Sequence, residues 1–217
     1  MIELVGIAGS AFLVAFSGAL VPGPMLAVTL GETPGSGPAT GLFVALGHSI
    51  LELALLIAIL LGFDALFTSP AVSSAIGLIG GAMLVFMGAT MILEARKAAP
   101  ATPGATLGGR RRSVPGLMYE GVYTSVSNPY FFLWWATVGL GYIVISRKFG
   151  PAGIAVFYAG HISADIVYYS FVSATLHFGR GTLGARGLKA LSVACAAALL
   201  CFGAYFAHSG LKGLSVI

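Results

Sequence analysis

Two histidine–carboxylate pairs give this sequence its clearest chemical signal. His48 precedes Glu52 by four positions, and His161 precedes Asp165 by the same spacing. On a helix, residues four positions apart lie on one face, one turn from each other. Imidazole changes its charge near neutral pH, and imidazole and carboxylate groups both bind metal ions. The two pairs therefore suit proton passage or cation binding.

The composition places these pairs inside a membrane protein. Apolar residues make up 58% of the 217 residues and charged residues 8%, whereas soluble domains carry roughly 25% charged residues. Six apolar segments are near or above the roughly 20 residues that a spanning helix needs. The sequence therefore predicts an all-α membrane protein with six transmembrane helices and no soluble domain. The predicted spans are residues 3–30, 41–63, 71–93, 116–145, 151–177 and 188–208.

Only two of the seven acidic residues, Glu52 and Asp165, fall near the middle of a span. A carboxyl group at the bilayer centre costs about 2.5–3.5 kcal/mol on insertion scales, so it usually faces the bundle interior and has a function there. A simpler interpretation is that each pair is a polar contact that ties two helices together. We expect the four groups to form a ladder in the order imidazole, acid, acid, imidazole.

Basic residues in the connecting segments set the expected orientation. Residues 98–115 are rich in Gly, Ala and Pro and have no apolar periodicity, which predicts a flexible linker. Basic residues gather at this linker and after the fifth span, and cytoplasmic loops carry an excess of Lys and Arg. We therefore expect the linker in the cytoplasm and both termini outside the plasma membrane. The net charge of +4 thus reflects topology, and no nucleic-acid partner is expected.

An internal repeat relates the two halves of the chain. A Gly-Pro-Ala motif at residues 37–39 recurs at 150–152, and Gly-His-x-x-x-acid at residues 47–52 recurs at 160–165, each after 113 positions. The predicted halves, residues 1–97 and 116–217, each hold three spans. Because three is an odd number, the second half must enter the membrane upside down. Inverted repeats that meet at a midplane site are common among transporters.

The first span of each half contains a motif that interrupts a helix. The first half has Pro22-Gly23-Pro24, and the second has Asn128-Pro129. Proline removes a backbone donor and clashes with the preceding turn, so both helices are expected to be broken, beside a shared cavity. An ordinary proline kink is the alternative for either motif alone. The aromatic residues Trp134, Trp135, Tyr168 and Tyr169 could contact an organic substrate, but such residues are routine in membrane helices.

These motifs, with the basic linker between three-span halves, resemble the LysE/RhtB family of amino-acid exporters, in the LysE superfamily, over nearly the whole chain. The resemblance implies export of an amino acid or a related small metabolite, driven by the proton motive force, and allows for a homodimer. It also implies that Pro22, Gly23, Pro24, Asn128 and Pro129 lie at the central site. The chain departs from well-known members at Met25 and in its paired His-x-x-x-acid motifs, which suggest a divergent branch.

Two other function classes stay open at this point. Relatives in the wider superfamily handle cadmium, manganese, nickel or cobalt, and two imidazoles with two carboxylates would suit such a metal as cargo. An intramembrane enzyme would use the same groups for hydrolysis, but a duplicated inverted site suits alternating access better. The sequence contains no nucleotide-binding loop, CxxC, HExxH or GxSxG motif. We therefore predict a transporter without a catalytic residue, a cofactor or a resident metal ion.

Overall fold

The computed structural model of this chain describes residues 1–63, 69–97 and 111–214, and every regular element in these ranges is helical. The first half contains α1 (Ile2–Ala19), α2 (Pro24–Ser36), α3 (Thr40–Ala58), a π-helical turn η1 (Ile59–Phe63) and α5 (Pro70–Lys97). The second half contains α6 (Val114–Val126), α7 (Pro129–Trp134), a π-helical turn η2 (Trp135–Gly139), α8 (Leu140–Arg147) and α9 (Gly150–Leu214). The predicted all-α class is confirmed. Most of the predicted linker, residues 98–110, lies outside the described residues.

Five segments of the described chain are long and apolar enough to cross a bilayer: Ile2–Ala19, Thr40–Gly62, Pro70–Leu93, Pro129–Arg147 and Val193–Gly213. The protein is therefore a multi-pass membrane protein. The predicted span at residues 151–177 is helical but is not among the five. Its histidines, serines, tyrosines and Asp165 make it less apolar than the others. Six spans remain a prediction.

Both predicted helix breaks are present. The first helix ends at Ala19 and resumes at Pro24, with extended backbone at Gly23 (φ −139°, ψ −178°). The other ends at Val126 and resumes at Pro129, after Asn128 in a β conformation. Each new helix starts with proline in its first turn, where the missing N–H costs nothing. These interruptions divide what the sequence predicts as single spans into shorter helices.

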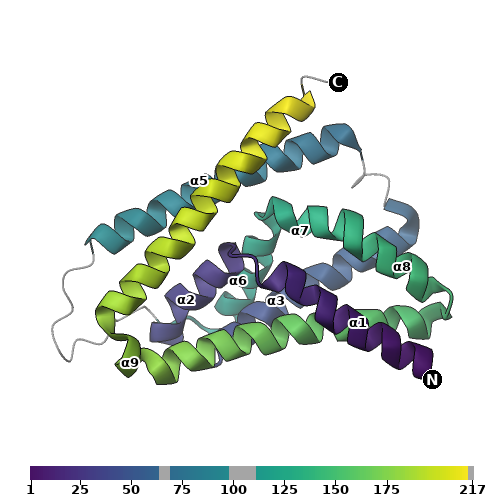
Figure 1. Cartoon of the computed structure of the whole chain (residues 1–217), viewed down its shortest axis with the longest axis horizontal. Helices are drawn as coiled ribbons and strands as arrows, with labels where there is room; N and C mark the ends of the chain where they lie inside the picture. Colours follow the sequence, from purple (N-terminus) through teal and green to yellow (C-terminus); the bar gives the residue numbers. More distant parts are fainter. Residues whose placement is uncertain (64–68, 98–110, 215–217) are drawn as a thin grey trace.

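The long element α9 turns back on itself. Figure 1 shows its green part running from α8 across the molecule and its yellow part leaving in another direction toward the C-terminus. We call residues 150–179 the first arm and residues 193–214 the second arm. The sequence predicts a loop between them, whereas the structure keeps helical backbone through that region.

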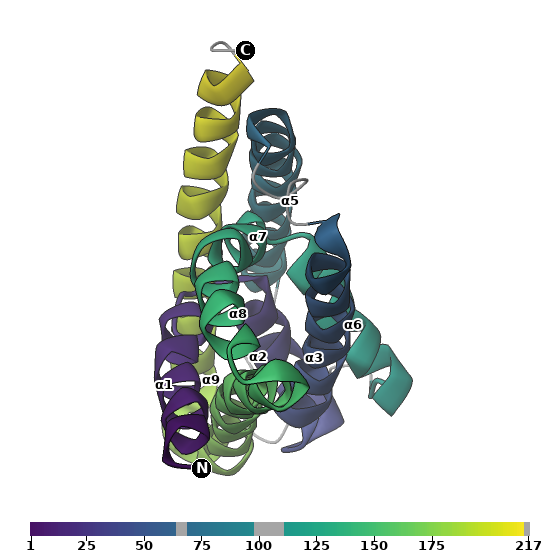
Figure 2. The same cartoon turned by 90° about the vertical axis from the view of Figure 1, so that its right-hand side faces the viewer.

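The first arm of α9 and α3 run antiparallel to each other, in the lower part of Figures 1 and 2. A Cβ atom on Gly41, at the start of α3, would overlap the backbone carbonyl of Tyr169, and the Tyr158 hydroxyl donates to the Ser49 carbonyl at 2.6 Å. Two further glycines allow close crossings with other helices: Gly47 against α6 and Gly160 against α1. Both precede the histidines of the repeated motif, so the motif glycines set the spacing of the helices around it.

The second arm of α9 packs along α5, at the top of Figure 1. Gly77 and Gly81 of α5 lie against the backbone near Phe206 and Gly210, and Leu84 is buried beside Leu199. Small residues at such contacts let membrane helices approach closely. The Gly77-x-x-x-Gly81 sequence is thus a packing motif, as its residue types predict.

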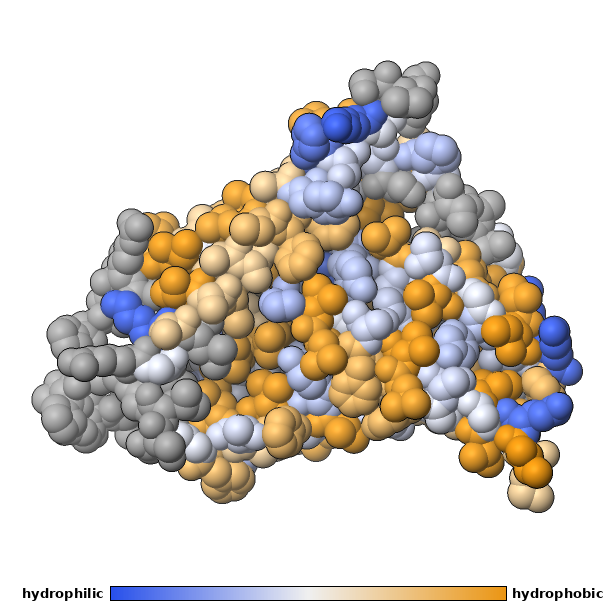
Figure 3. Space-filling view, viewed as in Figure 1, coloured by the Kyte–Doolittle hydropathy of each residue, from blue (hydrophilic) through white to orange (hydrophobic). Residues whose placement is uncertain are grey.

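The molecular surface is largely apolar, as lipid contact requires. Figure 3 shows hydrophobic side chains spread over much of the face it draws, with hydrophilic ones mainly near its ends. Large apolar side chains exposed to the surroundings include Leu13, Phe86, Phe171 and Tyr205. In a bilayer these side chains would contact lipid, so their exposure is consistent with the spans.

We predict that Gly47→Ala lowers stability because its new methyl group would overlap the backbone of Met118 and force α3 and α6 apart. Overpacking of this kind costs about 1–3 kcal/mol. Gly141→Ala is the matched control, since nothing lies within 4 Å of a Cβ there. Thermal unfolding in detergent, followed by tryptophan fluorescence, should show a lower midpoint for Gly47→Ala only. Equal midpoints for the two variants would contradict the close crossing.

Candidate functional site

The four residues of the repeated motif meet at one buried site between two helices. α3 supplies His48 and Glu52, and the first arm of α9 supplies His161 and Asp165. All four are buried, with exposures between 1% and 8%. They meet because the two helices are antiparallel and each places its histidine and its acid on one face. The sequence predicts this convergence, although the two motifs lie 113 positions apart.

The Oε1 atom of Glu52 is the centre of the cluster. It lies 2.8 Å from Nε2 of His161 and 3.2 Å from Nε2 of His48. The indole N–H of Trp135 donates to the same oxygen at 3.0 Å. Three nitrogen atoms thus surround one carboxylate oxygen, which favours the ionised form of Glu52.

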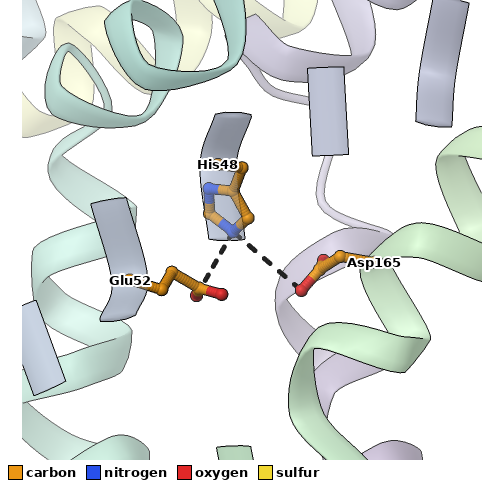
Figure 4. A group of neighbouring side chains, drawn as sticks. All are labelled: His48, Glu52 and Asp165. Atoms are coloured by element: carbon orange, nitrogen blue, oxygen red, sulfur yellow. Dashed lines mark ion pairs between the residues drawn. The ribbon is translucent and has the colours of Figure 1, made fainter. Parts of the chain in front are cut away.

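Asp165 has a different position in the cluster. Its Oδ2 atom lies 3.9 Å from Nε2 of His48 and 3.9 Å from Nε2 of His161, beyond hydrogen-bond distance of either ring. Figure 4 shows His48 between Glu52 and Asp165, with its ring directed at both carboxyl groups. The expected ladder of imidazole, acid, acid, imidazole is therefore wrong: each imidazole faces both acids, because the four residues surround a common point.

Ser125 of α6 holds the ring of His48. The Ser125 hydroxyl lies 2.6 Å from Nδ1 of His48 and 2.6 Å from the carbonyl oxygen of Gly121. Nε2 of the same ring lies 3.2 Å from Oε1 of Glu52, so each nitrogen of His48 has a polar partner. The imidazole is therefore fixed between α6 and the carboxylate.

Three polar atoms of the cluster lack a hydrogen-bond partner: Oε2 of Glu52, Oδ2 of Asp165 and Nδ1 of His161. A buried polar atom without a partner is costly and calls for an explanation, such as a ligand, an ion or a water molecule at the site. All three residues border a cavity of about 60 Å³, which has room for water.

Aromatic side chains also line this cavity, beside the cluster. The ring of Trp134 stacks on His161 with a centroid distance of 4.5 Å, and Phe131 meets His48 edge-on at 5.5 Å. Tyr130, Trp135 and Tyr169 also line the cavity. The sequence interpretation treated Trp134, Trp135 and Tyr169 as routine membrane aromatics, because nothing in their local pattern shows that they face the paired motifs.

The residues of the two helix breaks lie at different distances from the cavity. Asn128 lines it, and Gly23 lies next to Asn128, with about 3.5 Å between a Cβ built on Gly23 and the Asn128 amide nitrogen. Pro22 is exposed, Pro24 is buried, and Pro129 packs against Gly80 of α5. The prolines thus shape the backbone near the cavity, and their neighbours Gly18, Ala19, Met25, Ser125 and Tyr130 line it.

The cluster has ligand types that a divalent metal ion accepts. One ligand atom each from His48, Glu52 and Asp165 lies within 4.8 Å of the other two. Imidazole with carboxylate suits several first-row metals. The same atoms equally suit a proton or an organic cation, so the donor set alone does not decide the cargo.

Arg112 forms a second polar cluster that the sequence did not predict. Its Nε lies 2.9 Å from Glu32 of α2, its Nη1 lies 2.7 Å from Glu120 of α6, and its backbone N–H donates to Ser36. We call this arrangement the arginine clamp. It joins the two helix segments that adjoin the breaks, at the end of the molecule where α3 begins. The sequence assigned Arg112 to the linker and the two acids to span ends, and no spacing pattern connects them.

Comparison with known proteins identifies one matching family. A family model described as LysE type translocator matches residues 16–210, from the end of α1 into the second arm of α9. The resemblance noted in the sequence is thereby confirmed. The comparisons with curated proteins and with solved structures found no match.

We predict that Arg112→Gln loosens the contact between α2 and α6, because both carboxylates lose their cationic partner. The clamp is partly exposed, so the loss of stability should stay near or below about 1 kcal/mol. Hydrogen exchange should nevertheless rise in the backbone of α2 and of α6 near Glu120. Arg111→Gln, an equal change of charge one residue earlier, is the control. Unchanged exchange in Arg112→Gln would show that the clamp does not hold these helices together.

Proposed function

We propose, from the premise that this chain belongs to the LysE type translocator family, that it is a secondary active exporter coupled to protons. Members of this family export amino acids and related metabolites. We further propose that a small solute of this kind leaves the cell through the cavity beside the helix breaks. Protons that bind the four-residue cluster would drive its export.

The observation that supports the proposal most is the pairing of Glu52 with two imidazole rings inside the membrane-spanning bundle. Charged groups in this setting are expensive and mark ion or proton pathways. His48 contacts Ser125 through Nδ1 and Glu52 through Nε2, and imidazole gains and loses protons near neutral pH. A group that can change charge thus lies on the wall of the cavity that would bind the solute.

Contacts on both sides of the cluster fit an exporter in which access alternates. The arginine clamp closes the end where α3 begins. Toward the other end, Tyr158 donates to the Ser49 carbonyl and lines a second cavity of about 520 Å³ between α3 and α9. We propose that these two contacts open in turn, so that the cluster faces first one side of the membrane and then the other.

We also propose that the two halves are inverted repeats. In support of this, Gly37 and Gly150, separated by 113 positions, both have positive φ values, of 97° and 62°. Gly37 lies just before α3, and Gly150 is the first residue of α9. Gly47 and Gly160, with the same separation, each cross the first helix segment of the opposite half. The location in the plasma membrane, outward-facing termini and a homodimer remain parts of this proposal.

A divalent metal ion is the second candidate cargo, because His48, Glu52 and Asp165 can point three ligand atoms at one place. The aromatic wall argues for an organic solute instead, since a metal ion has no use for it. An assay that includes manganese, cobalt and zinc beside amino acids would separate the two.

The inverted arrangement predicts opposite sidedness for the two Gly-Pro-Ala turns. Single cysteines replace Ala39 and Ala152, both exposed, in a chain whose native Cys195 and Cys201 are changed to serine or alanine. A membrane-impermeant thiol reagent should then label one cysteine in right-side-out vesicles and the other in inverted vesicles. Labelling of both from the same side would exclude inverted halves.

The coupling proposal predicts that the double variant Glu52→Gln, Asp165→Asn loses export driven by a pH gradient in proteoliposomes. Both amides can still form hydrogen bonds, but neither amide gains or loses a proton near neutral pH. Glu3→Gln, at the exposed start of α1, is the control and should retain activity. Thermal unfolding of each variant checks that the fold is intact. Full gradient-driven export by a folded double variant would end the hypothesis.

A further inference from the structure

The cavity has more hydrogen-bond acceptors than donors. Oε2 of Glu52 and Oδ2 of Asp165 are both buried without a partner, and the second lies 3.9 Å from each imidazole. Oε1 of Glu52, in contrast, already receives its donors from the surrounding rings. A ligand that satisfies the two free oxygen atoms must therefore bring its own N–H or O–H groups.

Cationic side chains are missing from the cavity wall. Among its lining residues in the described part of the chain, the ionisable groups are His48, Glu52, His161, Asp165 and the hydroxyls of two tyrosines, without lysine or arginine. The Tyr158 hydroxyl, outside this lining, donates to the Ser49 carbonyl. The wall thus offers carboxyl oxygen atoms to a ligand, and no side chain with a permanent positive charge.

The break before α7 does not replace such a cation. At the start of α7, the first N–H groups are those of Tyr130 and Phe131, and both already donate to Asn128, one to its side chain and one to its carbonyl. At the other break Pro22 and Pro24 have no N–H, and the first N–H groups of α2 are those of Met25 and Leu26. Helix starts commonly bind anions, so an anionic group of a solute would find its backbone donors at α2 and not at α7.

The aromatic wall complements this charge pattern. A cation within about 6 Å of an aromatic ring centre gains roughly 0.5–2 kcal/mol. Trp134 and Phe131 are each in ring contact with an imidazole of the cluster, so a cation held by the carboxylates would lie close to aromatic rings. Carboxyl groups and aromatic rings in one cavity make a setting that favours an organic cation.

We propose that the solute is recognised through a protonated primary amino group, which donates to Asp165 Oδ2 and Glu52 Oε2 and displaces a proton from Asp165. This inference rests on the proposed export function and adds the chemical class of the solute. A carboxylate on the solute is not required for binding. Amines and amino acids thus both fit the site, whereas carboxylic acids without an amino group do not.

The exchange balances in charge. In the empty site Asp165 Oδ2 has no donor, and an ionised carboxylate buried without a partner is expensive, so Asp165 holds a proton. When the ammonium arrives, the Asp165 O–H bond breaks and that proton leaves to water on the open side. The carboxylate then accepts an N–H bond from the solute. One cation enters as one proton leaves, and no further reactant is needed.

Proton release from detergent-solubilised protein tests this inference. The probes are primary amines from methylamine to hexylamine. Each amine is compared with the amino acid that has the same carbon chain plus a carboxylate, and with the carboxylic acid that lacks the amino group of that amino acid. Butylamine, norvaline and pentanoate form one such set. A pH-sensitive dye in weakly buffered solution reports protons. We expect amines and amino acids to release one proton per molecule bound and the carboxylates to release none. Apparent amine affinity should fall as the pH is lowered, because protons compete for Asp165.

Asp165→Asn should abolish the release, and Glu3→Gln should retain it. Amino acids that release protons when no amine does would overturn the inference, as would release by carboxylates, release by manganese or zinc alone, or no release by any probe. Export of norvaline that is driven by a proton gradient, without proton release when amines bind, would contradict this inference and leave the proposed function intact. Amine-dependent release without gradient-driven export of any probe would contradict the function instead.

Discussion

A carboxylate in the interior of an apolar bundle must obtain hydrogen-bond donors from other helices, and this requirement organises the molecule. Glu52 obtains them from His48 on its own helix, from His161 on α9 and from Trp135 in η2. Each donor fixes the position of the element that carries it. A buried acceptor that loses its donors is costly, so an element that moves away from Glu52 lowers the stability of the bundle.

Glycine makes this convergence possible. An imidazole ring can reach across a helix interface only if the two backbones are close, and Gly41 brings α3 against α9 in this way. Gly47 and Gly160, each one position before a motif histidine, bring α3 against α6 and α9 against α1. The motif Gly-His-x-x-x-acid is thus one structural unit. The glycine sets the approach, the histidine supplies a donor, and the acid one turn later supplies the acceptor.

The sequence predicts this motif and the helix breaks because both depend on local residue types. Proline disfavours the interior of a helix, and a mid-span acid is conspicuous in an apolar segment. The donors Trp135 and Ser125 could not be predicted, because tryptophan and serine are common in membrane helices and only the packing shows which of them face Glu52 and His48. The arginine clamp was missed for the same reason, since no local pattern connects Arg112 with Glu32, 80 positions away.

Glu52 has short hydrogen bonds in the cluster and Asp165 has none to the two histidines, and this asymmetry is what an exchange site needs. Glu52 is saturated at Oε1, whereas Asp165 Oδ2 stands 3.9 Å from both rings. If both acids were equally well paired, an incoming solute would have to break several short hydrogen bonds before forming its own. With one acid firmly bound, the cluster keeps its shape, and with the other acid weakly bound, it retains a place where a proton and a cation can replace each other. The firm contacts therefore preserve the geometry while Asp165 remains free to change partner.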